Sequence, residues 1–501
     1  MPLPIKHQLK GPWIHIFIPM VFIILMVLFH PFRETFQQDT DEGINLIKAV
    51  LVMEGHQITG DIASDQPPLL SNLLAMVFER TGVSVNIGRF VILLFSALLL
   101  GAAGMAAEIA WGRTTSMFVY VMMILLPNYL LASVSVMIGQ PSIALAMVAM
   151  LCVFLWHRDR NWPWLLLAGL FMSLSLFMKI FTAILIPILG IGLLVGQWMH
   201  LRGTAKGISY WVQLMKPAFI FSLSLVVISA ALALVFVDLE NGMDLILPHL
   251  EYRQLTSVTG SITADLKPAL FPILLAAIGL GSTIAKQKWL GLYPAAWAIL
   301  AYLSLLNHNP VWWHHQLLIT VPAAMLAAYG VTSILKWFKG LNQDQSWKWK
   351  VLVFCGILII GAFLNQQLRV VGVELENRAP SFRSYGLDPE SGDMRILSEM
   401  NSLAQEGTLI VTDMPIFAVR AKMLIPVELA WVSDKRFRTG FLSEQDFIDV
   451  IERDKPALVL IARYPLSEVR AYLDSNPNYE EVLSTKIHTD RKATLYHRIE
   501  P

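Results

Sequence analysis

The chain has 501 residues, of which 55% are hydrophobic and only 15% are charged, and its mean hydropathy is +0.56, which is typical of a membrane protein. A net charge of +1 excludes the basic footprint of a nucleic-acid-binding protein. Both cysteines, Cys152 and Cys355, fall inside apolar segments, so neither a disulfide framework nor a metal cluster is indicated.

The first apolar segment, residues 12–32, is too long for the hydrophobic region of a signal peptide and lacks a small-residue cleavage pattern. We expect it to be retained as a membrane span. Further segments approach the roughly 20 residues that a bilayer core demands, and they lie near 87–111, 115–137, 141–157, 162–178, 181–200, 217–237, 268–285, 289–306, 316–335 and 350–368. The sequence therefore predicts an α-helical polytopic membrane protein with about eleven transmembrane helices in a domain of residues 1–370.

Lysine and arginine are distributed unevenly between the two sets of loops, which sets the orientation of a membrane protein. With a cytoplasmic N-terminus, the cytoplasmic loops hold Arg113, Arg158, Arg160, Arg202, Lys206, Lys216, Lys286, Lys288, Lys336, Lys339, Lys348 and Lys350. The opposite loops hold only Arg33, Lys48, Arg80, Arg89, Lys179, Arg253 and Lys267. This bias predicts a multi-pass protein of the cell's inner or plasma membrane, with the loops 32–86 and 238–267 and everything after about residue 369 outside the cytoplasm.

Three acidic residues, Asp39, Asp41 and Glu42, follow the first span directly. A carboxylate beside a bilayer is costly unless it faces water, a cation or a substrate. The stretch is therefore either a solvated loop, which charged residues often form, or part of a functional site.

The rest of this first outside loop predicts two helices along the membrane surface. Apolar residues recur at helical spacing over 42–53, although Asn45 and Lys48 interrupt them. The pair Pro67 and Pro68 fixes a bend and can begin a second helix, Leu69–Glu79. Such an arrangement would hold the acidic residues near one place above the membrane.

The last part of the chain, 385–501, changes composition and predicts a small extracytoplasmic α/β domain. The apolar runs 408–412 and 457–461 read as buried strands, and 492–499 reads as a final strand. Residues 443–454 begin with a capping serine and have helical apolar spacing. We expect this domain to shape access of an acceptor, with the chemistry carried by residues before it.

Polar residues at the outside ends of membrane helices are the candidates for a site, and they are Asp39, Asp41, Glu42, Asp65, Gln66, Arg89, Gln140, Lys179, His314 and His315. Lys179 stands between two apolar runs, so it either extends to the interface or holds an anionic lipid head group. Arg89, at the start of the second span, has the same two interpretations.

His314 and His315 follow the pair Trp312 and Trp313, which indicates an interfacial position. The two histidines then either pack at the interface or belong to a site. A metal pair is a weaker interpretation, because adjacent side chains on a helix point about 100° apart. No metal and no cofactor is indicated.

Outward-facing carboxylates beside one or two cations suit transfer from a lipid phosphate. The leaving phosphate is stable as an anion, so no general acid is needed. One carboxylate can take the proton from an acceptor hydroxyl or amine, while a lysine or arginine neutralises the departing phosphate. Glycoside hydrolysis differs, because it needs two carboxyl groups that flank the bond.

Several short motifs, in this order, resemble the membrane glycosyltransferases of the C-type fold, especially the protein O-mannosyltransferase and lipid A aminoarabinose transferase group. The motifs are Asp41-Glu42 after the first span, Asp65-Gln66-Pro67-Pro68-Leu69, Gly88-Arg89-Phe90, Phe177-Met178-Lys179 with Pro187 downstream, and His314-His315-Gln316-Leu317-Leu318 with Pro322 downstream. The resemblance covers about residues 10–335 and includes an outside α/β domain.

The resemblance implies inverting transfer of a hexose or pentose from a polyprenyl-phosphate carrier to a lipid, glycan or protein, in many members without a metal. It implies Asp41 as the general base and Lys179 on the lipid phosphate. The chain departs from the pattern at two positions. Gln66 stands where relatives often have lysine, and Gln140 lies in a turn where relatives often have an acidic residue.

Other functions fit the same pattern of residues. A lipid-linked oligosaccharide ligase, or a transferase that elongates a lipid-linked glycan, would need similar groups. A polyprenyl-lipid transporter should show repeats and charges near the middle of the membrane, whereas the charges here gather at one face. A non-catalytic assembly factor that binds a partner through its C-terminal domain is the third alternative.

Overall fold

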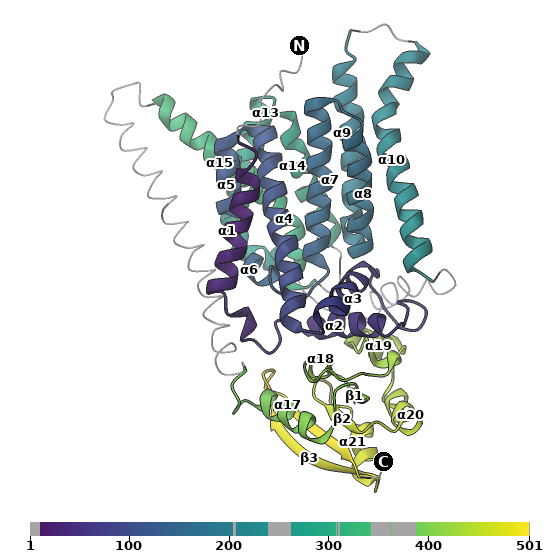
Figure 1. Ribbon diagram of the computed structural model, residues 1–501. Helices are drawn as coiled ribbons and strands as arrows, with labels where there is room; N and C mark the ends of the chain where they lie inside the picture. Colours follow the sequence, from purple (N-terminus) through teal and green to yellow (C-terminus); the bar gives the residue numbers. More distant parts are fainter. Residues whose placement is uncertain are drawn as a thin grey trace.

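The computed structural model describes residues 11–203, 207–238, 262–306, 308, 311–341, 361 and 387–499. The predicted span 350–368 lies outside these residues except at position 361, as does most of the predicted loop 238–267. Figure 1 shows a bundle of long helices, two short helices lying across one of its ends, and a mixed α/β segment beyond them.

The bundle contains most of the predicted spans as helices. They are α1 (Ile14–Phe29), α4 (Val85–Trp111), α5 (Arg113–Ile124), α6 (Tyr129–Ala132), α7 (Gly139–Asp159), α8 (Pro163–Met178), α9 (Leu185–His200), α10 (Ile208–Phe236), α13 (Leu270–Ala285), α14 (Leu292–Leu306) and α15 (Leu317–Leu341). Within the described residues, seven helical segments are long and apolar enough to cross a membrane, and α1 and α8 are shorter apolar helices. The chain is therefore a mostly helical, polytopic membrane protein.

The predicted span 115–137 differs from a single helix, because it is divided into α5 and α6. Pro127 lies in the break, where it disfavours helical geometry at the residue before it. Asn128 then takes the left-handed conformation, with φ of 61°. After this break the chain forms the short helix α6 before α7 begins.

The two surface helices are present as α2 (Thr40–Met53) and α3 (Leu69–Thr81). Helix α2 begins at Asp39, whose Oδ1 accepts a hydrogen bond of 2.9 Å from the backbone N–H of Asp41. An aspartate at this position satisfies a backbone donor that the first helical turn leaves unpaired. The predicted proline bend precedes α3, with Pro68 directly before the helix.

The C-terminal segment, residues 387–499, contains a four-stranded sheet in the order β1-β2-β4-β3. The strands are β1 (Ile410–Thr412), β2 (Leu458–Ile461), β3 (Tyr479–Lys486) and β4 (Lys492–Arg498). The pair β1–β2 is parallel and the other pairs are antiparallel. The helices are α17 (Gly392–Leu403), α18 (Ile416–Ala421), α19 (Asp434–Thr439), α20 (Glu444–Asp454) and α21 (Ser467–Ser475).

The C-terminal segment packs directly on the surface helices. One apolar core includes Leu46 and Ile47 of α2 together with Ile416 and Phe417 of α18. Arg420 strengthens this contact, because its guanidinium donates hydrogen bonds of 2.7–2.9 Å to the backbone carbonyls of the loop before α2, at Thr35 and Phe36. Buried apolar area is the main stabilising term for such a contact, so α2 and the C-terminal segment form one packed layer.

Gly43 sets the distance between α2 and α18. A Cβ atom at this position would lie 2.6 Å from the backbone nitrogen of Ile416. Only glycine permits so close an approach of two backbones. The glycine directly after the acidic residues therefore serves the docking of the C-terminal segment.

Candidate active site

Seven charged side chains influence one another at the end of the bundle that carries α2 and α3, and we call them the charged cluster. They are Asp39, Asp41, Lys48, Asp65, Lys179, Lys435 and Arg463. They come from α2, from the loops before α3 and after α8, and from the C-terminal segment (Figure 1).

Asp41 lies in the first turn of α2 with its side chain exposed to solvent. Protein atoms nevertheless surround the carboxylate, so desolvation and the negative charge of Asp39 together raise its pKa to about 6. The cations Arg463 and Lys179 act in the opposite direction. A carboxylate with a pKa near neutrality, open to solvent, is suited to accept a proton.

Asp39 is occupied on both of its oxygens. One accepts the backbone N–H of Asp41, and the other accepts a hydrogen bond of 3.0 Å from the indole Nε1 of Trp313. Asp39 therefore caps α2 and also joins that helix to the turn η6 (Trp313–Gln316). This geometry favours Asp41 over Asp39 as the group free to do chemistry.

Lys179 links α8 to the turn η2 (Ile180–Ile184) in extended backbone geometry. Its Nζ lies 3.4 Å from Nε2 of His314 and 4.9 Å from the ring centre of Phe181. Desolvation lowers the pKa of Lys179 to about 8, while Asp41 and Asp65 oppose that shift. A bound anion would stabilise the protonated form of this lysine, because its charge replaces the stabilisation that water supplies to an exposed ammonium.

Lys48 and Lys435 both lie near one tryptophan, Trp431. Lys48 is 2% exposed and its Nζ donates a hydrogen bond of 2.9 Å to Oγ of Ser64. Lys435 Nζ lies 2.6 Å from Oδ2 of Asp65. Both ammonium groups lie within 6 Å of the Trp431 ring centre, at 5.5 and 5.9 Å, so one aromatic ring of the C-terminal segment contacts both cations.

Arg463 is held in place by a buried aspartate. Asp413, which is 0% exposed, accepts backbone N–H hydrogen bonds of 2.6–2.9 Å from Ala462, Arg463 and Tyr464. Three donors on one carboxylate fix the loop after β2. Arg463 in this loop is close enough to Asp41 for its positive charge to lower the pKa of that carboxyl.

Glu42 and Arg89 form a buried ion pair. Both side chains are 0% exposed, and Arg89 donates from Nε and Nη2 to the two Glu42 oxygens at 2.8 and 2.7 Å. Arg89 also donates to the backbone carbonyls of Phe32 and Thr35. We expected Glu42 in the chemistry and Arg89 on a lipid phosphate; the structure instead encloses both as a support beneath the start of α2.

Four other predicted site residues, two glutamines and two histidines, make the following contacts. Gln140 is 2% exposed and its Nε2 donates to Oγ of Ser96 at 3.1 Å, so it faces α4. Gln66 follows Asp65 and its N–H donates to Oγ of Ser64. His314 contacts Lys179, whereas Nδ1 of His315 accepts the backbone N–H of Trp312 at 3.2 Å and stabilises the turn.

Sequence reasoning missed three of the cations. Lys48 carried a signal, since it interrupts the apolar face of a surface helix. Lys435 and Arg463 carried none, because they are ordinary charged residues of a soluble-looking segment. Both lie in the C-terminal segment, whereas the sequence placed all the candidate site residues before it. In the described part of the chain, no group of three or more His, Cys, Asp or Glu residues is arranged to hold a metal ion.

No protein-family model matches the sequence, and no curated protein is a significant match. Solved structures do resemble it. ArnT from Cupriavidus metallidurans bound to undecaprenyl phosphate superposes with a TM-score of 0.63 at 14% identity, over 96% of this chain and 97% of that one. AglB, the oligosaccharyltransferase of Archaeoglobus fulgidus, in complex with an inhibitory peptide and a dolichol-phosphate, gives 0.53 at 11% identity, over 91% and 70%.

Both structures are membrane glycosyltransferases of the C-type fold. At these identities the likeness establishes the fold. The chain therefore has the C-type membrane glycosyltransferase fold, which confirms the resemblance drawn from its sequence motifs.

Proposed function

We propose that the protein is a glycosyltransferase that moves a sugar from a polyprenyl-phosphate carrier to an acceptor outside the cytoplasm. The observation that carries this proposal is the position of Asp41, an exposed carboxylate with a pKa raised to about 6, in electrostatic contact with Lys179. A proton acceptor and an anion-binding cation are the two groups that this transfer needs.

In the proposed reaction, Asp41 takes the proton of an acceptor hydroxyl or amine as that oxygen or nitrogen attacks the anomeric carbon of the sugar. The bond from that carbon to the phosphate oxygen breaks, and its electron pair leaves with the polyprenyl phosphate. A single displacement of this kind inverts the anomeric configuration. The acceptor is a lipid, a glycan or a protein.

Lys179 binds the phosphate of the donor. It stands at the boundary between α8 and η2, where a polyprenyl chain in the bilayer would present its head group. Its ammonium is already partly desolvated, so less water must be removed when the phosphate binds. His314, which lies beside its Nζ, positions the lysine.

Lys435 and Arg463 add positive charge from the C-terminal segment. Nearby cations stabilise the negative charge that develops on the departing phosphate. Lys435 is close enough to Lys179 for its charge to lower the pKa of that lysine. Gln66 supplies no charge at the proline bend, and Lys435 brings an ammonium to the adjacent Asp65. The proposed site is therefore built by both parts of the chain.

The ligands of the two similar structures support this assignment. One holds undecaprenyl phosphate, and the other holds a dolichol-phosphate and an inhibitory peptide. Lipid phosphates of this class would be the donor carriers here. The lysine and arginine bias supports a cytoplasmic N-terminus, with the charged cluster and the C-terminal segment on the outer side.

The proposal is tested with the full chain in detergent by measuring binding of undecaprenyl phosphate. Lys179→Ala should weaken binding strongly, Lys179→Arg should retain part of it because a guanidinium fork replaces a compact ammonium, and Asp41→Asn should bind normally. If the wild type and the two Lys179 variants bind undecaprenyl phosphate equally, the proposed donor site is contradicted. Transport of the lipid across a vesicle bilayer by Asp41→Asn at the wild-type rate would favour a transporter.

A further inference from the structure

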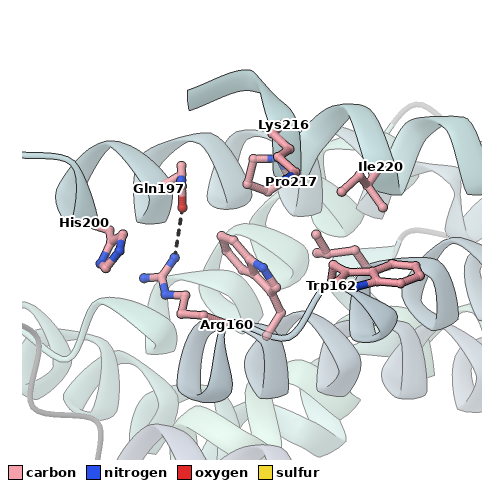
Figure 2. Close-up of a pocket in the computed structure, with 9 residues that line it drawn as sticks. Arg160, Trp162, Gln197, His200, Lys216, Pro217 and Ile220 are labelled. Atoms are coloured by element: carbon pink, nitrogen blue, oxygen red, sulfur yellow. Dashed lines mark hydrogen bonds between the residues drawn. The ribbon is translucent and has the colours of Figure 1, made fainter. Parts of the chain in front are cut away.

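A second charged site lies at the opposite end of the bundle from Asp41. Nine residues surround a cavity of about 220 Å³ between the ends of α7, α8, α9 and α10, and they are Trp156, Arg160, Trp162, Leu165, Gln197, His200, Lys216, Pro217 and Ile220. Figure 2 shows Arg160 within this group, hydrogen-bonded to Gln197. A volume below the roughly 300 Å³ of the smallest drug-sized sites suits a head group.

The polar lining is basic. Arg160 and Lys216 carry positive charge, His200 can gain one, and none of the nine residues is acidic. Asp159, the acidic residue that precedes Arg160 in the sequence, is held by Arg158 through contacts of 2.6 and 2.7 Å. The cavity therefore offers an anion positive charge without a competing carboxylate.

Arg160 is held at the cavity by contacts with two other lining residues. Its guanidinium stacks 4.6 Å from the ring centre of Trp156 and donates to Oε1 of Gln197 at 3.2 Å. Its backbone is left-handed, with φ of 57°, at the residue that ends α7. Desolvation lowers the pKa of Arg160, so a bound anion would replace stabilisation that water no longer supplies.

The remaining lining residues are apolar. Leu165, Pro217 and Ile220 supply aliphatic surface, and Trp162 is 58% exposed. An exposed tryptophan at the end of a membrane helix is typical of the interface between head groups and acyl chains. Basic cavities between transmembrane helices on the cytoplasmic side are suited to anionic lipid head groups.

We propose that this cavity binds the phosphate head group of an anionic membrane lipid, separately from the donor site. The phosphate lies between Arg160 and Lys216, and the acyl chains leave along Trp162 and Ile220. The proposal differs from simple interfacial anchoring, because an anchor would need neither a cavity nor a guanidinium held by Trp156 and Gln197.

Native mass spectrometry of the full chain with added phosphatidylglycerol or phosphatidylcholine tests the proposal. The wild type should retain phosphatidylglycerol in preference. The double variant Arg160→Gln/Lys216→Gln should lose roughly thirtyfold in affinity, since one basic residue near an anionic lipid contributes about fivefold. Arg160→Lys should retain part of the binding. Lys288→Gln, which removes an exposed cation outside the cavity, is the matched control and should bind as the wild type does.

Three results would overturn the assignment. An equal loss in Lys288→Gln would show a general effect of surface charge. Unchanged binding in the double variant, with a wild-type elution profile on size exclusion, would remove the cavity from lipid binding. Retention of inorganic phosphate without lipid, abolished in the double variant, would assign the site to a free anion. Undecaprenyl phosphate binding at Lys179 should be unaffected in all of these variants, which separates this test from that of the donor site.

Discussion

The ammonium group of Lys435 lies 2.6 Å from a carboxylate oxygen of Asp65, although 370 residues separate the two in the chain. This ion pair joins the C-terminal segment to the proline bend before α3, and both side chains are mostly buried. Removing one partner of a mostly buried ion pair is costly, because it leaves the other charge without compensation. The C-terminal segment therefore contributes to the charged cluster itself.

Replacing Lys435 by Gln should weaken binding of undecaprenyl phosphate by at least about tenfold, because a charge-assisted hydrogen bond contributes about 1.5–3 kcal/mol. The measurement is a lipid-binding titration of the full chain. Lys422→Gln is the matched control, since that lysine is exposed and pairs with Glu406 away from the cluster. Equal affinities for Lys435→Gln and Lys422→Gln would remove Lys435 from the donor site.

Gly43→Ala should loosen the C-terminal segment, because the new Cβ would lie 2.6 Å from the Ile416 nitrogen and the two backbones must separate. Limited proteolysis should then release a fragment of the C-terminal segment faster than in the wild type. Gly190→Ala is the control, since a Cβ there meets open space. If Gly43→Ala resists proteolysis as the wild type does, the close approach does not govern docking.

Removing one partner of the buried Glu42–Arg89 pair should destabilise the protein by about 3–5 kcal/mol, because the other charge is left buried without compensation. Thermal unfolding of Arg89→Met and Glu42→Gln measures this loss. The double variant Glu42→Met/Arg89→Met should lose less stability than either single variant. Should Arg89→Met keep wild-type stability and lose only donor binding, the arginine would be a phosphate ligand after all.

The pH dependence of kcat/KM for the donor should be bell-shaped. Asp41 must be ionised to accept a proton, so the rate should rise through its pKa of about 6. Lys179 must be protonated to bind phosphate, so the rate should fall through its pKa of about 8. The bound donor phosphate raises the pKa of Lys179. The alkaline limb of the kcat profile should therefore lie at a higher pH than that of the kcat/KM profile.

Lys179→Arg tests the assignment of the alkaline limb. Arginine stays protonated throughout this range, so the fall above about pH 8 should disappear in the variant while the acidic limb stays in place. An unchanged alkaline limb would assign it to another group, and Lys48, whose pKa is also lowered to about 8, would be next.

The sequence predicted the local elements of the site but not the partners of its charges. Apolar spacing predicted α2, and the proline pair predicted the start of α3. Glu42 is buried in an ion pair with Arg89, whereas Asp41 is exposed. The local sequence does not distinguish the two, because they are adjacent acidic residues. The contact between Asp65 and Lys435 depends on docking of the C-terminal segment, which no short-range pattern encodes.

The central claim is that Asp41 is the general base, and the turnover of Asp41→Asn tests it most directly. Membranes carrying the variant should transfer sugar from a labelled polyprenyl-phosphate donor at least about a hundredfold more slowly than the wild type, the usual contribution of a positioned base, while undecaprenyl phosphate binding is retained. Asp39→Asn should lose less, since asparagine also caps a helix and Asp39 is held by Trp313. Normal turnover of Asp41→Asn beside an inactive, well-folded Asp39→Asn would contradict the account.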